Sequence, residues 1–297
     1  MNGRERGFLL LSSHLGEPDR KPLTVPQLRE LAKRMQCREK PEEERELTAG
    51  DLTALGYDPA QTRRIVKLLE EEDVLDYHLR RGKSFDCVPL SRVSEGYPLI
   101  LRKRMGLDSP GVLWAKGDLS LLCEPTIALV GSRNLWEDNR SFAEEAGRQA
   151  ALQGYTLVSG NARGADKTAQ ESCLEAGGKI ICVVADELTR HPQRKHVLYI
   201  SEDGFEEPFS AQRALSRNRV IHALGLKTLV AQSSLKTGGT WDGTVRNLRF
   251  GYSPVFCYED GSEAVAMLTA MGAASIGIHD LKDLYDLNNP QKNLFDR

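Results

Sequence analysis

The chain is organised around residues 126 to 166, which read TIALVGSRNLWEDNRSFAEEAGRQAALQGYTLVSGNARGAD. Two short apolar runs, 127 to 130 and 155 to 158, each end in a glycine-containing turn that leads into a helical pattern. Strand, turn and helix therefore alternate, which predicts an α/β fold with a mostly parallel, Rossmann-like sheet. Because open sheets of this kind bind ligands at the carboxyl ends of their strands, we expect a site at the edge where the two turns meet.

Length and composition define the class of protein. The 297 residues allow one large domain and a smaller one, and 40% hydrophobic with 28% charged residues excludes disordered and collagen-like chains. The net charge of −2 does not by itself indicate nucleic-acid binding, but such binding depends on local clusters. Acids gather in 39 to 46 and 70 to 73, whereas seven basic residues and one acid lie between Ser210 and Phe250. The molecule is therefore polarised.

Cysteine and hydropathy patterns indicate a cytoplasmic protein. The 6 cysteines include no CxxC pair, and Cys182 and Cys257 lie in apolar runs, so we interpret them as buried residues in a reducing compartment. The apolar run GFLLLS is too short for a signal peptide, and no stretch reaches transmembrane length, so no membrane partner is expected. His191, His196 and His222 lack metal-ligand spacing, and neither a metal nor another cofactor is expected.

The helical and strand patterns divide the chain into three parts. Residues 1–85 are predicted to form an N-terminal helical domain separate from the sheet, with a third helix from Pro59 to near Val74 and a solvated loop at 39–46. Residues 86–281 are predicted to form the extended Rossmann-like domain, and residues 282–297 a polar tail. Within the second part, strands are expected at 127–130, 155–158, 179–184, 227–231 and 254–257, with an edge strand at 274–278. We interpret residues 186–212 as a lid or an insertion.

Four polar elements follow strands or begin helices along the expected edge. After the first strand, Gly131 lets a ligand approach the backbone, the Ser132 hydroxyl can donate to an oxyanion, and the Arg133 guanidinium can fork onto phosphate. In the second turn, 159–166, backbone amides and the helix dipole favour an anion. Asp166 there can cap the helix or hold a ribose hydroxyl, and capping is the preferred interpretation.

The third and fourth elements add cations and glycines. The segment Arg217-Asn218-Arg219 supplies many donors with no acid between them, and the loop 233–240 supplies hydroxyls, two glycines and a lysine. Together these elements favour a phosphate-bearing ligand. The candidate contacts are Gly131, Ser132, Arg133, Ser159, Gly160, Arg163, Gly164, Asp166, Arg217, Asn218, Arg219, Lys236, Gly238 and Gly239. Any of Trp114, Trp136 and Trp241 can stack on a base, with Trp136 favoured because it follows Arg133, and packing is the default expectation for all three.

These motifs resemble the successive signatures of the DNA-processing protein A (DprA/Smf) family over residues 85 to 258: VGSR, SGNARGAD, SE at 201, SRNRVIHAL and KTGGT. The resemblance implies an extended Rossmann-like domain that binds single-stranded DNA, forms a homodimer and loads a RecA-type recombinase during natural transformation. The phrase HPQRKHVLYISE departs from the family pattern, and within it Arg194 and Lys195 are additional candidate DNA contacts. No C-terminal winged helix is expected, which suggests a divergent member that works outside transformation, for example in phage defence or with a mobile element.

The rival interpretation is a nucleotide-binding sensor or N-glycosidic hydrolase of the related lonely-guy-like group. That group's GGxGTxxE motif supplies a catalytic glutamate, whereas the matching segment here has only Asp242. We therefore expect no catalytic residue and no enzyme activity. The sequence predicts electrostatic capture of single-stranded DNA, in which Arg133→Ala and Arg217→Ala each weaken binding to all sequences alike.

Overall fold

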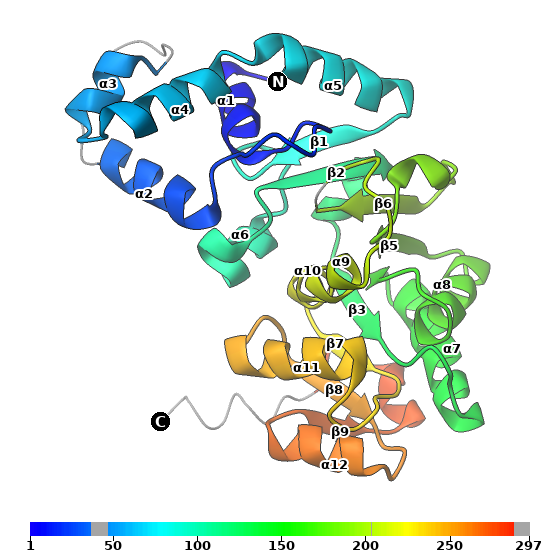
Figure 1. The fold of residues 1–297 in the computed structure, drawn as a ribbon. Coiled ribbons are helices and arrows are strands. Elements are labelled where there is room, and N and C mark those ends of the chain that lie inside the picture. Colours follow the sequence, from blue (N-terminus) through cyan, green and yellow to red (C-terminus); the bar gives the residue numbers. More distant parts are fainter. Residues whose placement is uncertain (37–46, 203, 288–297) are drawn as a thin grey trace.

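The computed structural model describes residues 1–36, 47–202 and 204–287 (Figure 1). The strands are β1 (Val88–Ser91), β2 (Val112–Gly117), β3 (Thr126–Val130), β4 (Thr156–Ser159), β5 (Lys179–Val183), β6 (Val197–Ser201), β7 (Thr228–Val230), β8 (Val255–Tyr258) and β9 (Ala274–Ile276). The α-helices are α1 (Gly3–Ser12), α2 (Val25–Gln36), α3 (Ala49–Ala54), α4 (Pro59–Leu69), α5 (Glu72–Ser84), α6 (Leu99–Met105), α7 (Glu137–Leu152), α8 (Ala165–Glu175), α9 (Ala211–Ser216), α10 (Asn218–Leu224), α11 (Gly238–Phe250) and α12 (Glu263–Ala270).

The strands form one nine-stranded sheet in the order β1-β2-β6-β5-β4-β3-β7-β8-β9. Every pair from β6 to β9 is parallel, and only the pairs that involve β2 are antiparallel. From β3 the chain builds β4, β5 and β6 on one side and then returns to place β7 on the other side. The strand order therefore reverses between β3 and β7, and the predicted Rossmann-like α/β class is confirmed.

Helices cover both faces of the sheet (Figure 1). On one face, α7 and α8 bury Phe142, Ala146 and Ala169 in a core with the sheet. On the other face, α6, α10, α11 and α12 bury residues such as Leu101 and Val220. Because each parallel strand is covered on both sides, its residues are apolar in succession, and β3 is buried along its whole length.

The N-terminal helices are divided between two cores. Leu9 and Leu10 of α1 and Leu75 of α5 belong to the core of the sheet, next to Trp114 of β2. The helices α2, α3 and α4 instead share a smaller cluster that includes Leu52. Helices α1 and α5 therefore attach the N-terminal segment to the sheet, and independent folding of residues 1–85 stays a prediction.

Several elements differ from the sequence expectations. Residues 186–212 contain the buried strand β6, because the run Val197 to Ile200 is apolar enough to pair between β5 and β2. The third helix ends at Leu69 rather than near Val74, and α5 follows it. The strands β1 and β2 extend the sheet beyond the expected parallel strands, and Leu284 and Leu287 pack in its core although they belong to the predicted polar tail. The predicted loop at 39–46 and the end of the tail lie outside the described residues.

Across the described residues, the chain contains no helix with the length and apolar character needed to span a bilayer.

Candidate functional site

The loops after β3, β4 and β7 meet at the carboxyl edge of the sheet, and we call residues 131–136, 160–164 and 231–237 the rim. The backbone N–H and the hydroxyl of Ser132 donate to the carbonyl oxygen of Gln232 at 3.0 and 3.3 Å, which joins the first and third loops. A Cβ atom at Gly131 would lie 2.5 Å from that of Ala165, so a larger residue does not fit there. The rim is thus assembled at the β3–β7 crevice, where open sheets of this type bind ligands.

The Gln232 side chain was not predicted from the sequence. Its amide oxygen accepts a hydrogen bond of 2.9 Å from the backbone N–H of Trp136, which fixes the chain as it enters α7. A neutral amide after a strand carries no distinctive signal, and only the strand order places it opposite Ser132.

The loop after β4 is shaped by Asp166. Its carboxylate accepts hydrogen bonds of 3.1 Å from the backbone N–H groups of Gly160 and Ala162. Burial raises the pKa of Asp166, and the positive charge of Arg217 and the two amides oppose that shift. Gly164 has a φ of +83°, and a Cβ there would lie 2.4 Å from the Ser132 carbonyl oxygen. Asp166 therefore folds the loop through Oδ2 and does not provide the predicted cap of α8, whose N-cap residue Gly164 has no side-chain hydrogen bond.

The segment Arg217-Asn218-Arg219 reaches the rim, but both of its cations have partners inside the protein. Arg217 is 8% exposed and donates from Nη1 to the carbonyl oxygen of Val183 at 2.6 Å. Burial lowers its pKa, against the attraction of Asp166 and Asp186. Arg219 pairs with Glu202. In this structure the Arg217 guanidinium is buried, and the partly exposed Arg219 guanidinium is paired with a carboxylate.

The partners of these arginines explain why the sequence did not reveal their burial. Glu202 follows β6 and Asp166 begins α8, so both acids come from elements distant in the chain. The Asn218 amide also has an internal partner, since Nδ2 donates to the Gly239 carbonyl oxygen at 2.8 Å. Within this segment, Asn218 joins α10 to the start of α11.

Three cations remain exposed on the rim: Arg133, Arg163 and Lys236. Arg163 donates to Oδ1 of Asn134 at 2.7 Å, which leaves its other donors open to solvent. Arg133 and Lys236 form neither a hydrogen bond nor an ion pair with any side chain in the part of the protein that the structure describes. These two side chains are available to an anion.

The start of α11 adds backbone donors beside Lys236. Its N-cap residue Thr237 makes no side-chain hydrogen bond to the helix, and the first turn holds no acid. Gly238 has a φ of +86° and open space around it. By contrast, α7 begins with Glu137 and Asp138. Free amides and the positive end of the dipole therefore make the start of α11 the most favourable anion position on the rim.

The additional candidates Arg194 and Lys195 are exposed but lie elsewhere. They directly precede β6, whose first residue Val197 pairs with Ile180 at the beginning of β5. The amino ends of parallel strands lie at the edge opposite the rim, so these residues are not brought together with the other candidates.

The tryptophans separate clearly by exposure. Trp114 is 1% and Trp241 7% exposed, so both pack in the protein interior. Trp136 is 58% exposed at the edge of the rim, close in sequence to Arg133. Only Trp136 can offer its ring to a ligand in this structure.

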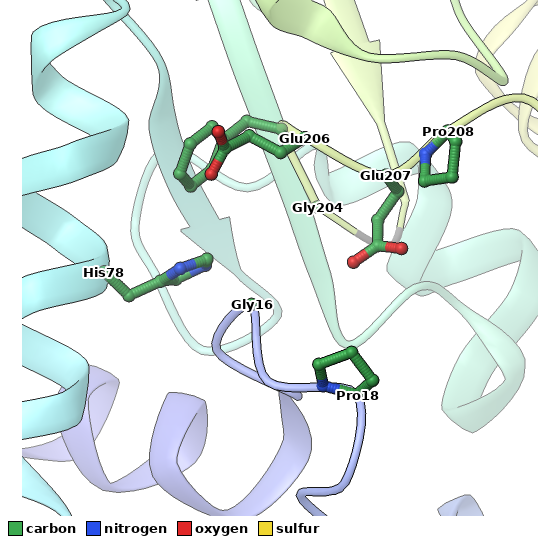
Figure 2. Close-up of a pocket in the computed structure, with 8 residues that line it drawn as sticks. Gly16, Pro18, His78, Gly204, Glu206, Glu207 and Pro208 are labelled. Atoms are coloured by element: carbon green, nitrogen blue, oxygen red, sulfur yellow. The ribbon is translucent and has the colours of Figure 1, made fainter.

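A cavity of about 210 Å³ lies between α5, the segment after α1 and the loop after β6 (Figure 2). His78 and Glu207 extend toward it from opposite sides. Burial lowers the pKa of His78 to about 4. None of the candidate site residues lines this cavity, and the described residues hold no group of three or more side chains suited to a metal ion.

A parallel sheet with an exposed basic rim at its switch point defines a Rossmann-like α/β protein. The chain belongs to the DNA recombination-mediator protein A family, whose model matches residues 89–251. DNA processing protein DprA of Bacillus subtilis is 29% identical over 170 residues, which cover 53% of this chain and 56% of that protein. Protein Smf of Escherichia coli is 33% identical over 147 residues, which cover 44% of this chain and 38% of that protein. The matched regions thus span about half or less of these relatives.

Two solved structures share the fold. DNA processing protein A from Streptococcus pneumoniae superposes with a TM-score of 0.72 at 24% identity, covering 95% of this chain and 98% of that one. DNA processing protein A from Helicobacter pylori, which has a single-stranded DNA binding mode, superposes with a TM-score of 0.56 at 23% identity, covering 67% and 94%. At these identities the similarity establishes the architecture.

Proposed function

We propose that this chain binds single-stranded DNA at the rim and holds its phosphates without cutting the strand. The observation that carries the proposal is that Arg133 and Lys236 are exposed on the rim and unpaired within the described residues, and that Lys236 directly precedes the uncapped start of α11. Backbone amides and flexible or forked cations are the groups that hold phosphates. Family membership supports this assignment, as does the single-stranded DNA binding mode of the Helicobacter pylori protein.

A hydrolytic function is less well supported by the carboxylates near the rim. Asp166 accepts hydrogen bonds from two loop amides, and Glu202 is paired with Arg219. Asp242 is exposed along α11. A general acid or base requires a carboxylate that is free to act beside the reacting bond, whereas Asp166 and Glu202 are engaged in contacts within the protein.

The resemblance supports three broader proposals. We propose that the protein acts in the cytoplasm, that it forms a homodimer, and that it delivers bound DNA to a RecA-type recombinase in transformation or recombination. The buried cysteines Cys182 and Cys257 agree with a reducing compartment.

Fluorescence anisotropy of a labelled oligothymidylate across a salt series tests the DNA proposal. We expect binding that weakens steeply with salt, because phosphate contacts release counterions. Arg133→Ala and Lys236→Ala should each lower affinity by about tenfold or more and reduce the salt slope by about 0.7. The loss should be alike for all base sequences, since phosphate contacts carry no base information.

The controls are Arg63→Ala on α4 and Lys33→Ala on α2, which remove exposed cations away from the rim. Both should bind like the unaltered protein. Arg217→Ala would affect folding as well as binding, because this buried side chain supports the rim from inside. Salt-independent binding, or equal losses in the control variants, would contradict the assignment.

A further inference from the structure

One exposed stripe runs the length of α11. Its members are Gly238, Asp242, Arg246, Arg249 and Phe250, which are exposed while Trp241, Gly243, Thr244 and Asn247 are buried. Residues spaced by three or four positions lie on the same face of a helix. The stripe therefore begins beside Lys236 on the rim and ends at Phe250 at the far end of α11.

The far end of the stripe carries an aromatic ring between two cations. Phe250 is 55% exposed, and the guanidinium carbons of Arg246 and Arg249 lie 5.8 and 5.5 Å from the centre of its ring. The ring stacks on Tyr252 with centroids 5.9 Å apart and an angle of 15°, and Tyr252 is 5% exposed. Phe250 is thus supported from the protein side and open on the solvent side.

The two arginines have no acidic partner among the residues that the structure describes. Both arginines lie in the last turns of α11, where the helix dipole favours positive charge. The dipole alone therefore explains why cations occur at these positions. The dipole does not account for a large aromatic ring held open to water between them. An exposed ring flanked by arginines is the combination with which proteins bind single strands, since bases stack on the ring and phosphates meet the cations.

We propose that a single DNA strand held at the rim continues along α11 and ends on a second contact made by Arg246, Arg249 and Phe250. This inference rests on the proposed function of the rim. The 13 residues of α11 span about 20 Å at 1.5 Å per residue. A strand with stacked bases rises about 3.4 Å per nucleotide, so about six nucleotides cover this length. A strand longer than this reaches both contacts, whereas a very short one occupies the rim alone.

The class of partner follows from the charges of the stripe. Between Lys236 and Phe250 the helix presents two arginines and one acid, Asp242, to solvent. Such a surface favours a polyanion. Duplex DNA offers no open base faces to Phe250, so the ring selects a single strand.

The test compares oligothymidylates of 4 and 15 nucleotides by fluorescence anisotropy at fixed salt. We expect Phe250→Leu to weaken binding of the 15-mer about tenfold and to leave the 4-mer unchanged. Phe250→Tyr, which keeps an aromatic face, should bind the 15-mer like the unaltered protein. Arg246→Ala should likewise affect only the 15-mer and lower its salt slope.

The control is Tyr77→Leu on α5, which removes another exposed aromatic ring and should change neither affinity. Equal affinity of Phe250→Leu and the unaltered protein for the 15-mer overturns the inference while the rim proposal stands. A change in sedimentation of Phe250→Leu with unchanged 15-mer binding also overturns it and assigns the ring to a protein contact. Absence of salt-sensitive binding by the unaltered protein would instead remove the rim proposal itself.

Discussion

Two buried histidines show how local surroundings set the chemistry of single residues. His222 of α10 is fully buried, and its Nδ1 accepts a hydrogen bond of 3.1 Å from the side-chain amide Nδ2 of Asn247. The proton of the neutral ring therefore lies on Nε2, which has no partner. Burial lowers the pKa of His222 to about 3, as it lowers that of His78 to about 4. Both rings are neutral at physiological pH.

These two residues predict acid sensitivity of the fold. Each pKa lies below the ordinary histidine value of about 6.5, so the unfolded chain binds more protons than the native protein at intermediate pH. Their contribution to stability is complete above pH 6.5 and is lost as the pH falls toward 4. Each histidine should lower the free energy of unfolding by about 1.4 kcal/mol per pH unit in that range.

Urea denaturation from pH 7.5 to 4.5 measures how steeply the free energy of unfolding falls with pH. In His78→Leu this slope should be smaller by about 1.4 kcal/mol per pH unit, which is the contribution of one histidine. Phe8→Leu is the control, because Phe8 packs against the same core without titrating. An unchanged slope in His78→Leu would show that His78 does not titrate between the two states.

For single residues, the sequence predicts position at the edge of the sheet better than it predicts exposure to solvent. The glycine turns at Gly131 and Gly160 lie at the carboxyl edge of the sheet, as expected from the strand–turn–helix order. The burial of Arg217 was not predictable, because Val183 and Asp166 come from other elements. A local motif reports which groups are present, and the tertiary fold decides which of them meet solvent.

Among the secondary-structure elements, the loop after β4 and the start of α10 depend on one close contact. A Cβ built at Gly160 would lie 1.7 Å from Nη1 of Arg217, and that guanidinium is held by the carbonyl oxygen of Val183 at the end of β5. Gly160 is therefore required so that Arg217 can join the ends of two neighbouring strands to α10.

We predict that Gly160→Ala lowers the free energy of unfolding by about 1 to 3 kcal/mol and weakens DNA binding, because Arg217 must leave its position. Urea denaturation and anisotropy measure the two effects. Gly7→Ala in α1 is the control, since a Cβ there meets no atom within 4 Å. It should be neutral or slightly stabilising, because alanine favours helix.

A double-mutant cycle identifies the cause of any loss. If the clash with Arg217 is responsible, Gly160→Ala combined with Arg217→Ala should be no less stable than Arg217→Ala alone. Additive losses would show that Gly160 matters for another reason, such as the backbone of its own loop.

The elements themselves were predicted unevenly, for physical reasons. The long amphipathic α7 and the apolar β3 carry strong periodic signals. The strand β6 was missed because its apolar residues follow a basic, proline-containing stretch that is typical of a loop. The break between α4 and α5 was missed because Glu70 and Glu71 favour helix, and packing of α5 on the sheet overrides that preference.

For the molecule as a whole, the order of the strands in the sheet brings motifs that are distant in the sequence together at one edge. The rim forms because the chain returns from β6 to place β7 beside β3, which brings Lys236 to the same edge as Arg133. The sequence shows which segments form strands, but it does not show which strands are neighbours in the sheet. The expected convergence at one edge therefore depended on the general behaviour of parallel sheets.

This arrangement predicts that inorganic phosphate stabilises the folded protein through the rim. A ligand that binds only the native state raises its stability by RT ln(1 + [L]/Kd), which is about 1.4 kcal/mol at ten times Kd. In a domain of this size, that amounts to a rise in melting temperature of about 2 to 4 °C. The shift is measured against sodium chloride of equal ionic strength.

Phosphate also stabilises proteins in general by exclusion from their surfaces, so the informative quantity is the difference between variants. Lys236→Ala and Arg133→Ala should lose most of the specific shift, whereas Lys33→Ala on α2 should retain it. Phe250→Leu should also retain it, because a single phosphate ion occupies the rim and does not reach the end of α11. Equal shifts in all four variants would mean that phosphate acts on the whole surface, and that the exposed cations of the rim do not form an anion site.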